Sequence, residues 1–572
     1  MPKFFLIIIK RRKKKIESYF CICSKKLQCE DLIGITIPNF SSQIESDTSG
    51  NEGNIEENNK NEILKFKEGF LVRAIKNARC VIFDQINEAP STVYERLNGL
   101  LDKKYNDEDN TFPIPEYSEK ANPKIKKNFR IICTCNINKL KNISPAFLSR
   151  FDIVYLENQL DNINEYRELV ETLFQRFEKL EKEERKMKKE KKNKEINSNN
   201  NGIEYHQPNE VNDNMDYSVS DKMINLVIDK IKILKNVDSA EKKYISNYSI
   251  SSISRFCFSI YKLLLKFRDK LIREINEEEI VNIVFDLRFL RNPNEIKISK
   301  YPSIRNFILE IIKNIKQSEL EENYSFENSE NLENFVGIVY LSSLINLYLC
   351  VESPPGYGKT TAARAIAKMR EIDENLEKKF YIQTFHSSTY PTNLYGTSTI
   401  NYNQITFNKG PLTRALIEGK FFIADELNIS PLSTILSIVP ILDLIFDTRL
   451  FIPGMVSYNK EFRISSSFFL IICQNNVGII GRSELPASLL RKIRKINYPE
   501  LEDKEIKKIC NDIDIFLSNH NNNNILIGKE ESEKIAKCMI QFKKEKQHFK
   551  EPWSLRDVTK LIKRLKYQKE KK

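Results

Sequence analysis

The chain has 572 residues, of which 41% are hydrophobic and 30% are charged, and its formal net charge is +13. This composition allows a sizeable core and two to four domains, and it excludes a membrane protein as a whole, because no apolar run approaches the roughly 20 residues that span a bilayer. The eleven cysteines and four histidines lack the spacing of a disulfide framework or a zinc site. We therefore expect a soluble intracellular protein with reduced thiols and no membrane partner.

The chain begins with a short apolar run, Phe4–Ile9, which is followed by the basic run Lys10–Lys15. A secretory signal carries its charge before a longer apolar region, so this order argues against one. The basic run is compatible with a nuclear address, and a cytoplasmic location stays open. Other lysine-rich tracts are interpreted as solvated surfaces, and sequence-specific binding of nucleic acid is not expected.

A first set of elements alternates between helix and strand. The pattern predicts a helix at Leu71–Lys76, an apolar strand ending at Asp84, a helix after Pro90 and a strand at Phe129–Asn136. Such alternation predicts a parallel sheet with helices on both faces. A helical pattern follows from about 160 to 300, and within it the Lys/Glu block Glu178–Asn201 is expected to protrude as a helix and loop.

The same elements recur 341 residues later. Gly69–Asp102 and Gly410–Asp443 align without a gap and are identical at ten of 34 positions. The second copy predicts a helix at Leu412–Glu418 and a strand at Phe468–Asn475. A repeat of this length indicates two copies of one domain, and the acidic stretch Ser318–Asn334 is the expected linker between them.

A phosphate-binding loop precedes the second copy. A predicted strand, Leu347–Glu352, leads into Ser353-Pro-Pro-Gly-Tyr-Gly-Lys-Thr360 and then into a predicted helix, Thr361–Met369. Glycines let backbone N–H groups turn toward phosphate oxygens, the lysine can reach the β- and γ-phosphates, and the threonine hydroxyl can ligate Mg²⁺. Ser353 replaces the usual first glycine, and we expect binding to survive. The expected nucleotide contacts are Pro355, Gly356, Tyr357, Gly358, Lys359, Thr360 and Thr361.

Acidic residues follow a strand 65 residues after this loop. Phe421-Phe-Ile-Ala-Asp425-Glu426 ends in two carboxylates. Asp425 at the end of the strand can hold Mg²⁺ together with Thr360, and Glu426 can polarise the attacking water. Asn475 ends the next strand and can orient that water. The pattern therefore predicts an ATP- and Mg²⁺-dependent hydrolysis site.

Together these residues resemble the AAA+ family, and more narrowly its midasin/dynein-related branch. Further similar phrases are Leu394-Tyr-Gly396 with the polar hairpin Thr397–Lys409, Gly410-Pro-Leu, Asp425-Glu-Leu-Asn428 and Phe451-Ile-Pro453. The resemblance implies an α/β fold with two AAA+ modules, each a P-loop-type parallel sheet flanked by helices plus a small all-helical lid. The expected divisions are a first core at 16–160, its lid with the lysine-rich insertion at 161–317, a linker at 318–334, an active core at 335–500 and a second lid at 501–572.

The resemblance also implies roles for arginines. An arginine finger follows the strand of Asn475, and Arg491 fits this position, with Arg494 as a second choice. Arg150 fits it in the first copy, within Ser144-Pro-Ala-Phe-Leu-Ser-Arg150-Phe-Asp152. A second sensor arginine on the lid is matched by Arg556.

The first copy is degenerate. Its segment Phe20–Gly34 corresponds to Tyr381–Gly396, so no room remains upstream for a phosphate-binding loop. Gln85 stands where the second copy has Glu426, and Ser251 where it has Arg556, so the first copy is not expected to hydrolyse ATP. Truncation of a larger multi-module protein is the favoured explanation, and a complete protein whose first module survives as a scaffold is the alternative.

The expected function is ATP hydrolysis by a midasin-like mechanochemical protein, which would be slow as an isolated chain. The resemblance implies maturation of the large ribosomal subunit (pre-60S) in the nucleus, with other AAA+ modules and pre-ribosomal particles as partners. A non-hydrolytic nucleotide-binding scaffold stays open. So does another dynein-related protein, such as a MoxR-type chaperone or a member of the ring-type ubiquitin ligase branch.

Overall fold

The computed structural model describes residues 18–38, 64–154, 163–198, 218–236, 250–269, 276–316, 330–450, 462–475, 484–510, 529–544 and 555–570, apart from short gaps within these ranges. The chain divides into two compact units. Unit 1 comprises Met1–Gln159, Thr389–Gly419 and Ser437–Phe468. Unit 2 comprises Leu160–Ser388, Lys420–Leu436 and Phe469–Lys572. Each unit therefore draws on both halves of the sequence.

Unit 1 contains a three-stranded parallel sheet, with β4 (Cys80–Asp84) between β1 (Ser18–Ile22) and β5 (Arg130–Cys133). Buried side chains such as Val81 and Phe83 on the central strand pack with those of α2 (Phe70–Asn77) in one hydrophobic core. The other helical segments of this half are α1 (Cys29–Ile33), η3 (Ile86–Glu88), α3 (Ser91–Glu95), α4 (Asn98–Leu101) and α5 (Pro145–Leu148).

Unit 1 also contains two similar helix–hairpin segments. The first is α1 with the antiparallel pair β2 (Gly34–Pro38) and β3 (Leu64–Glu68). The second is α13 (Pro391–Tyr395) with β8 (Gly396–Asn401) and β9 (Gln404–Lys409), which agrees with the predicted hairpin. In both, a glycine with positive φ (Gly34, 129°; Gly396, 116°) joins helix to strand. The second segment continues into α14 (Pro411–Glu418), η10 (Val439–Asp443), β11 (Arg449–Leu450) and β12 (Phe462–Arg463).

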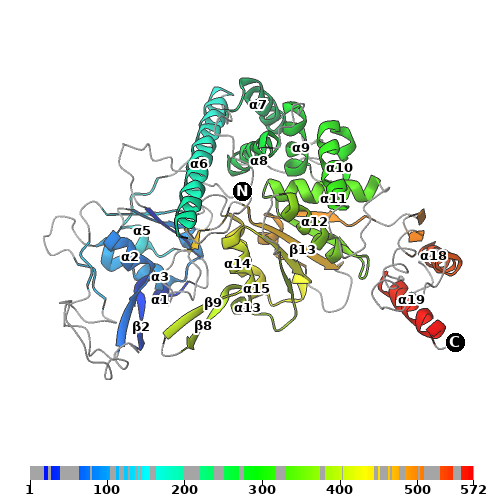
Figure 1. Cartoon of the computed structure of the whole chain (residues 1–572). Helices are drawn as coiled ribbons and strands as arrows, with labels where there is room; N and C mark the ends of the chain where they lie inside the picture. Colours follow the sequence, from blue (N-terminus) through cyan, green and yellow to red (C-terminus); the bar gives the residue numbers. More distant parts are fainter. Residues whose placement is uncertain are drawn as a thin grey trace. The chain divides into compact units, whose positions relative to one another are not determined.

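Unit 2 contains a five-stranded parallel sheet in the order β14-β6-β13-β10-β7. The strands are β6 (Leu349–Ser353), β7 (Tyr381–Thr384), β10 (Phe421–Asp425), β13 (Phe469–Asn475) and β14 (Arg494–Asn497). Every residue of β13 is buried, which is typical of a central strand covered on both faces. Helix α12 (Lys359–Asp373) contacts β6, β10 and β13, and α11 (Glu330–Leu344) lies against it (Figure 1). The α/β fold predicted from the sequence is confirmed.

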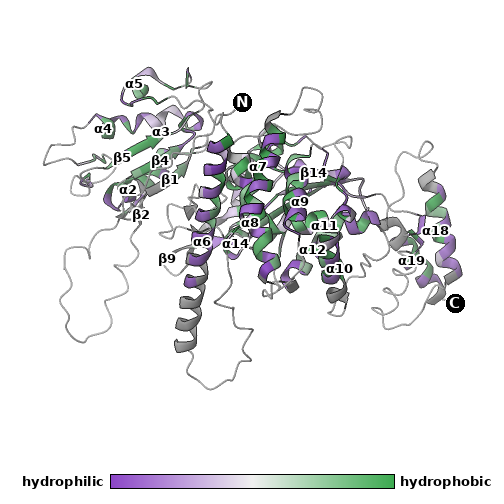
Figure 2. Ribbon diagram, turned by 90° about the horizontal axis from the view of Figure 1, so that it is seen from above, coloured by the Kyte–Doolittle hydropathy of each residue, from purple (hydrophilic) through white to green (hydrophobic). Residues whose placement is uncertain are grey.

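Five helices of unit 2 belong to the helical stretch predicted after the first core: α6 (Ile163–Ser198), α7 (Asp221–Asn236), α8 (Ile250–Asp269), α9 (Glu277–Phe289) and α10 (Pro302–Lys316). Helix α9 begins where the Asn276 side chain accepts a hydrogen bond from Glu278 N, and three glutamates occupy its first turn. Acidic side chains favour a helix N-terminus. Figure 2 shows polar and apolar faces on α7, α8 and α9, and the apolar faces supply buried residues such as Phe256 and Phe285.

The strands predicted at Phe129–Asn136 and Leu347–Glu352 are shorter or shifted, as β5 and β6, and two further boundaries differ at helix starts. Helix α12 begins at Lys359 rather than Thr361, because Lys359 and Thr360 already form its first turn. Helix α11 begins at Glu330, so the last five residues of the expected linker 318–334 are helical. Asn334 explains the second difference, since its side chain hydrogen-bonds the backbone of Ile296 and Ile298 and so holds this turn against the preceding segment.

The remaining helical elements are η7 (Pro293–Glu295), η8 (Ile298–Lys300), η9 (Leu427–Ile429), α15 (Leu432–Ile438), α16 (Ala487–Leu490), α18 (Lys529–Lys544) and α19 (Leu555–Glu570). Helices α18 and α19 share a small core with Ile506 and Cys510. Among the described residues, no helix is long and apolar enough to cross a membrane. Within that same part of the chain, no group of three or more histidines, cysteines or acidic residues is arranged to hold a metal ion.

Candidate functional site

The candidate site lies at the carboxyl ends of three neighbouring strands of unit 2. Parallel pairing places Ser353, the last residue of β6, beside Asn475, the last residue of β13. It also places Asp425, the last residue of β10, beside Cys473 of β13. Side chains that end these strands are therefore gathered at one edge of the sheet, where open α/β sheets bind their ligands.

The loop between β6 and α12 has the conformation that a phosphate cradle needs. Gly356 and Gly358 have φ values of 79° and 93°, a region that side chains with a Cβ rarely adopt. Helix α12 starts directly afterwards, so its first N–H groups and its positive dipole end meet the loop. Pro355 is exposed, whereas Tyr357 and Thr361 are half-buried.

Lys359 is buried, with 6% of its surface exposed. Its Nζ donates to Oδ1 of Asn475 and, at 3.5 Å, to the carbonyl of Ser353. Asn475 in turn donates through Nδ2 to Oε1 of Glu426, 2.5 Å away. A continuous polar chain therefore links the expected phosphate-binding lysine to the expected general base through one buried amide.

A second contact joins the loop to β10. The hydroxyl of Thr360 donates to Oδ1 of Asp425 at 3.0 Å. A hydroxyl and a carboxylate are hard oxygen ligands of the kind that Mg²⁺ prefers. These two groups therefore fit the predicted Mg²⁺ position beside the phosphate cradle.

Glu426 has an unusual backbone. Its φ and ψ are 59° and 40°, the left-handed region, which is uncommon for a residue with a side chain. Its counterpart Gln85 in unit 1 has almost the same conformation, with φ 56° and ψ 51°. Strained backbone of this kind clusters at functional sites. The repeat therefore keeps the geometry of this corner even where it has lost the carboxylate.

A polar network that the sequence does not reveal surrounds the buried Glu352 on the strand before the loop. Oε1 of Glu352 on β6 accepts a hydrogen bond from Nε2 of Gln474 at 2.7 Å, and Oε2 pairs with Nζ of Lys495 on β14 at 2.6 Å. These contacts tie the strand before the loop to both of its neighbours. No local signal marks them, because the partners come from strands more than 120 residues away in sequence.

The corresponding corner of unit 1 is satisfied internally. The Thr134 hydroxyl donates to Oδ1 of Asp84 at 2.5 Å and accepts a hydrogen bond from Gln85 N at 3.0 Å. Thr134 thus gives Asp84 the hydroxyl contact that Thr360 gives Asp425. Among the described residues of unit 1, no strand pairs with the outer edge of β5, where unit 2 has the loop-bearing β6.

The predicted arginines have different surroundings. Arg491 is exposed at the end of α16. Arg494, the second choice, instead donates to the backbone carbonyls of Leu287 and Leu290 at the end of α9, and burial lowers its pKa to about 10. Its guanidinium joins the helices after the first core to β14, so Arg491 is the better placed of the two.

Two further predicted features lie partly or wholly outside the residues that the structure describes. Arg556 lies in α19, but its side chain is outside the described residues. The phrase Phe451-Ile-Pro453 also lies outside them. Arg150 of unit 1 pairs with Asp102 on the same unit.

Comparison with known proteins agrees with this geometry. The sequence profile of the AAA domain (dynein-related subfamily) matches residues 31–151 and 349–493. Midasin of Dictyostelium discoideum is 38% identical over 117 residues, which are 20% of this chain and 2% of midasin. The uncharacterized protein YojN of Bacillus subtilis (strain 168) is 25% identical over 193 residues, 32% of this chain and 57% of YojN.

The chain thus spans less than two thirds of the length of either curated relative. Among solved structures, the closed state of Hsp104 with ATPγS and FITC casein aligns with 86% of this chain and with 76% of the Hsp104 chain. The two are 13% identical, and the TM-score is 0.32. So low a score carries no argument about this chain. The two matched segments are similar to AAA domains of the dynein-related subfamily, which supports an AAA+ ATPase.

Proposed function

We propose that this chain, whose residues 31–151 and 349–493 match the AAA domain (dynein-related subfamily), binds and hydrolyses ATP as part of a midasin-like mechanochemical remodelling protein. One observation carries the proposal. The hydrogen bonds Lys359–Asn475–Glu426 and Thr360–Asp425 bring five predicted site residues, from the start of α12 and the ends of β10 and β13, to one sheet edge. A phosphate-binding lysine, a Mg²⁺-binding carboxylate and a candidate base beside an amide are the groups that ATP hydrolysis requires.

Binding falls to the loop and the start of α12. The N–H groups around Gly356 and Gly358 would hold the phosphates, and Lys359 would move its donors from Asn475 to the β- and γ-phosphate oxygens. Thr360 and Asp425 would hold Mg²⁺, which neutralises charge on the phosphates when bound. The hydroxyl and carboxylate oxygens already lie 3.0 Å apart.

Hydrolysis falls to Glu426 and Asn475. The Glu426 carboxylate would accept a proton from the attacking water, a role worth about 10²–10⁴ in rate for a positioned base. Asn475 already donates to that carboxylate, so it fixes where the accepting oxygen points. In unit 1 the amide of Gln85 cannot accept this proton, which supports a scaffold role for the first module.

The isolated chain should be slow. The family resemblance implies that an arginine from a neighbouring module completes each ATP site, and such an arginine is worth about 10³–10⁵ in rate. By that logic the live site would depend on an arginine from another module. Head-to-tail association of two copies would offer Arg150 of one copy to the Lys359 site of the other.

The wider role follows the same resemblance. The resemblance of the quoted motifs to midasin motivates this proposal, in which the protein would act on pre-60S particles in the nucleus. A non-hydrolytic scaffold, a MoxR-type chaperone and a protein of the ring-type ubiquitin ligase branch are the alternatives. Loss of turnover in Glu426→Gln separates hydrolysis from binding alone.

The test is ATP turnover by the purified chain as a function of its concentration. We expect slow turnover per molecule that rises with protein concentration, disappears in Glu426→Gln and loses its concentration dependence in Arg150→Ala. Fast turnover that is independent of concentration down to nanomolar protein would contradict the requirement for a second module. Turnover in Glu426→Gln equal to that of the wild type would contradict the assigned base.

A further inference from the structure

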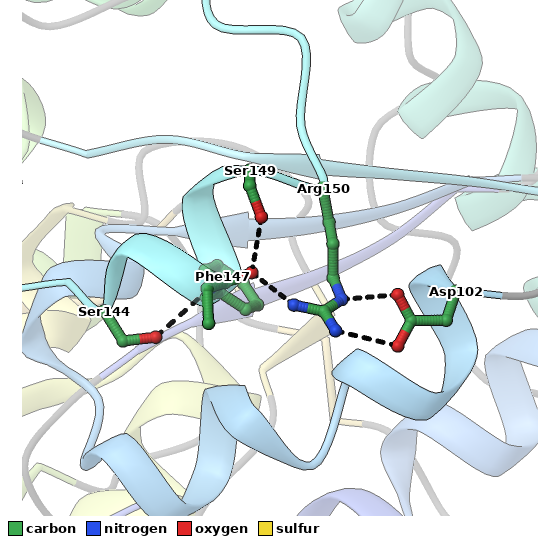
Figure 3. A network of polar contacts seen from close by, with 6 residues as sticks. Asp102, Ser144, Phe147, Ser149 and Arg150 are labelled. Atoms are coloured by element: carbon green, nitrogen blue, oxygen red, sulfur yellow. Dashed lines mark hydrogen bonds and ion pairs between the residues drawn. The ribbon is translucent and has the colours of Figure 1, made fainter.

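The arginine at the end of α5 is held by a bidentate ion pair (Figure 3). Nε of Arg150 donates to Oδ1 of Asp102 at 2.6 Å, and Nη2 donates to Oδ2 at 2.8 Å. The third nitrogen, Nη1, donates to the carbonyl of Ala146. The carboxylate and the backbone therefore fix the plane of the guanidinium in one orientation.

The pair is still accessible. The Arg150 side chain is 26% exposed and that of Asp102 is 55% exposed. A guanidinium carries five N–H groups, and the contacts with Asp102 and Ala146 use three of them. Two N–H groups thus remain for a ligand while the carboxylate stays in place.

The spacing of the two residue types also recurs in the sequence. Asp102 precedes Arg150 by 48 residues, and Asp443 precedes Arg491 by the same 48 residues. Unit 1 retains its pair although Gln85 has replaced the carboxylate that hydrolysis needs and Thr134 has filled the place beside Asp84. A pair that survives in a module without a working site is explained if it serves the site of another module.

We propose that Asp102 is a positioning residue, which holds the guanidinium of Arg150 side-on so that its free N–H groups meet the terminal phosphate of ATP bound by a second copy of this chain. This inference rests on the proposed function. An unrestrained arginine must lose the freedom of its long side chain when it binds a phosphate. Asp102 removes most of that freedom beforehand, and the planar fork can bind carboxylate and phosphate oxygens alike.

The pair is exposed, so its contribution should be modest. Hydrogen bonding to Arg150 lowers the pKa of Asp102, so the carboxylate stays ionised at neutral pH. We expect Asp102→Asn to raise the protein concentration at half-maximal turnover by about two- to fivefold, the effect of weakening an exposed ion pair. The KM for ATP should not change, because Lys359 and its neighbours bind the nucleotide on the other copy.

The experiment measures ATP turnover against concentration for the full chain, Asp102→Asn, Arg150→Ala and the double variant. In the Arg150→Ala background, Asp102→Asn should have no further effect, because its partner is gone. Asp152→Asn is the matched control, since it removes an exposed carboxylate two residues from Arg150. It should behave as the wild type, and thermal unfolding should show that all variants are folded.

The outcomes separate the two proposals. If the wild type does not hydrolyse ATP, the proposed function fails and this inference fails with it. If wild-type turnover rises with concentration but Asp102→Asn leaves the half-maximal concentration unchanged or lowers it, only the role of Asp102 is overturned. If Asp102→Asn lowered turnover equally in the wild-type and Arg150→Ala backgrounds, the role of Asp102 would also be overturned. An altered KM for ATP in Asp102→Asn would have the same consequence.

Discussion

Replacement of Lys359 by methionine should separate nucleotide binding from folding. Lys359 is 6% exposed, and methionine keeps an unbranched apolar stem there while it removes the ammonium that donates to Asn475. Without nucleotide, the loss of this hydrogen bond is opposed by the relief of a buried charge. We therefore expect the free energy of unfolding of the unliganded protein to change by less than about 1 kcal/mol.

The effect with ATP should be much larger. A ligand present at a hundred times its Kd stabilises the folded state by about 2.7 kcal/mol. Lys359 can donate two charge-assisted hydrogen bonds to phosphates, each worth about 1.5–3 kcal/mol, so its loss should weaken binding about 10²–10⁴-fold. At the same ATP concentration, the stabilisation should then fall to about 0.4 kcal/mol or less.

The assay is urea unfolding with and without Mg²⁺-ATP, alongside calorimetric titration of ATP. Lys420→Met is the matched control, because Lys420 is also a buried lysine. It lies just before β10, at the opposite end of that strand from Asp425. The control should retain the ATP-dependent gain. An undiminished gain in Lys359→Met, or equal losses in both variants, would refute the assignment of the phosphate-binding lysine.

Two further predictions concern packing. Arg494→Ala should lower the free energy of unfolding by about 1–3 kcal/mol, because two carbonyls at the end of α9 lose their donor. Arg491 is exposed, so Arg491→Ala should change the free energy of unfolding by less than about 0.5 kcal/mol. Equal urea midpoints for the two variants would contradict this prediction. Burial raises the pKa of the Cys473 thiol, so it stays protonated at pH 8. Mass spectrometry after iodoacetamide treatment should find the exposed Cys538 alkylated and Cys473 unmodified until the protein unfolds.

Much of the site was predictable because its signals are local. The glycines at 356 and 358, the lysine and threonine that follow, and the apolar strand before Asp425 each specify a conformation within a few residues. Asn475 was found because it ends the next apolar strand. The structure places these residues together as parallel pairing of β6, β13 and β10 requires.

What could not be predicted depends on strand register and on partners far apart in sequence. The network of Glu352, Gln474 and Lys495 joins three strands, and no spacing rule identifies it. Arg494 was the second choice for the finger, and its contacts with two carbonyls at the end of α9 could not be foreseen from the sequence. The division into units could not be predicted from the sequence either, because Thr389–Gly419 and Ser437–Phe468, which follow the phosphate-binding loop in sequence, belong to unit 1.

The hydroxyl that Thr134 supplies to Asp84 has a consequence for attempts to engineer activity into the first module. Restoring the base by Gln85→Glu would place a second negative charge beside Asp84, with no Lys359-like cation among the described residues of that unit to balance it. The hydrogen bond between Thr134 and Asp84 now connects β4 to the residue after β5. An active site in unit 1 would therefore need counterparts of β6, the phosphate-binding loop and α12 introduced together. A single reversion should yield a less stable protein that is still inert toward ATP.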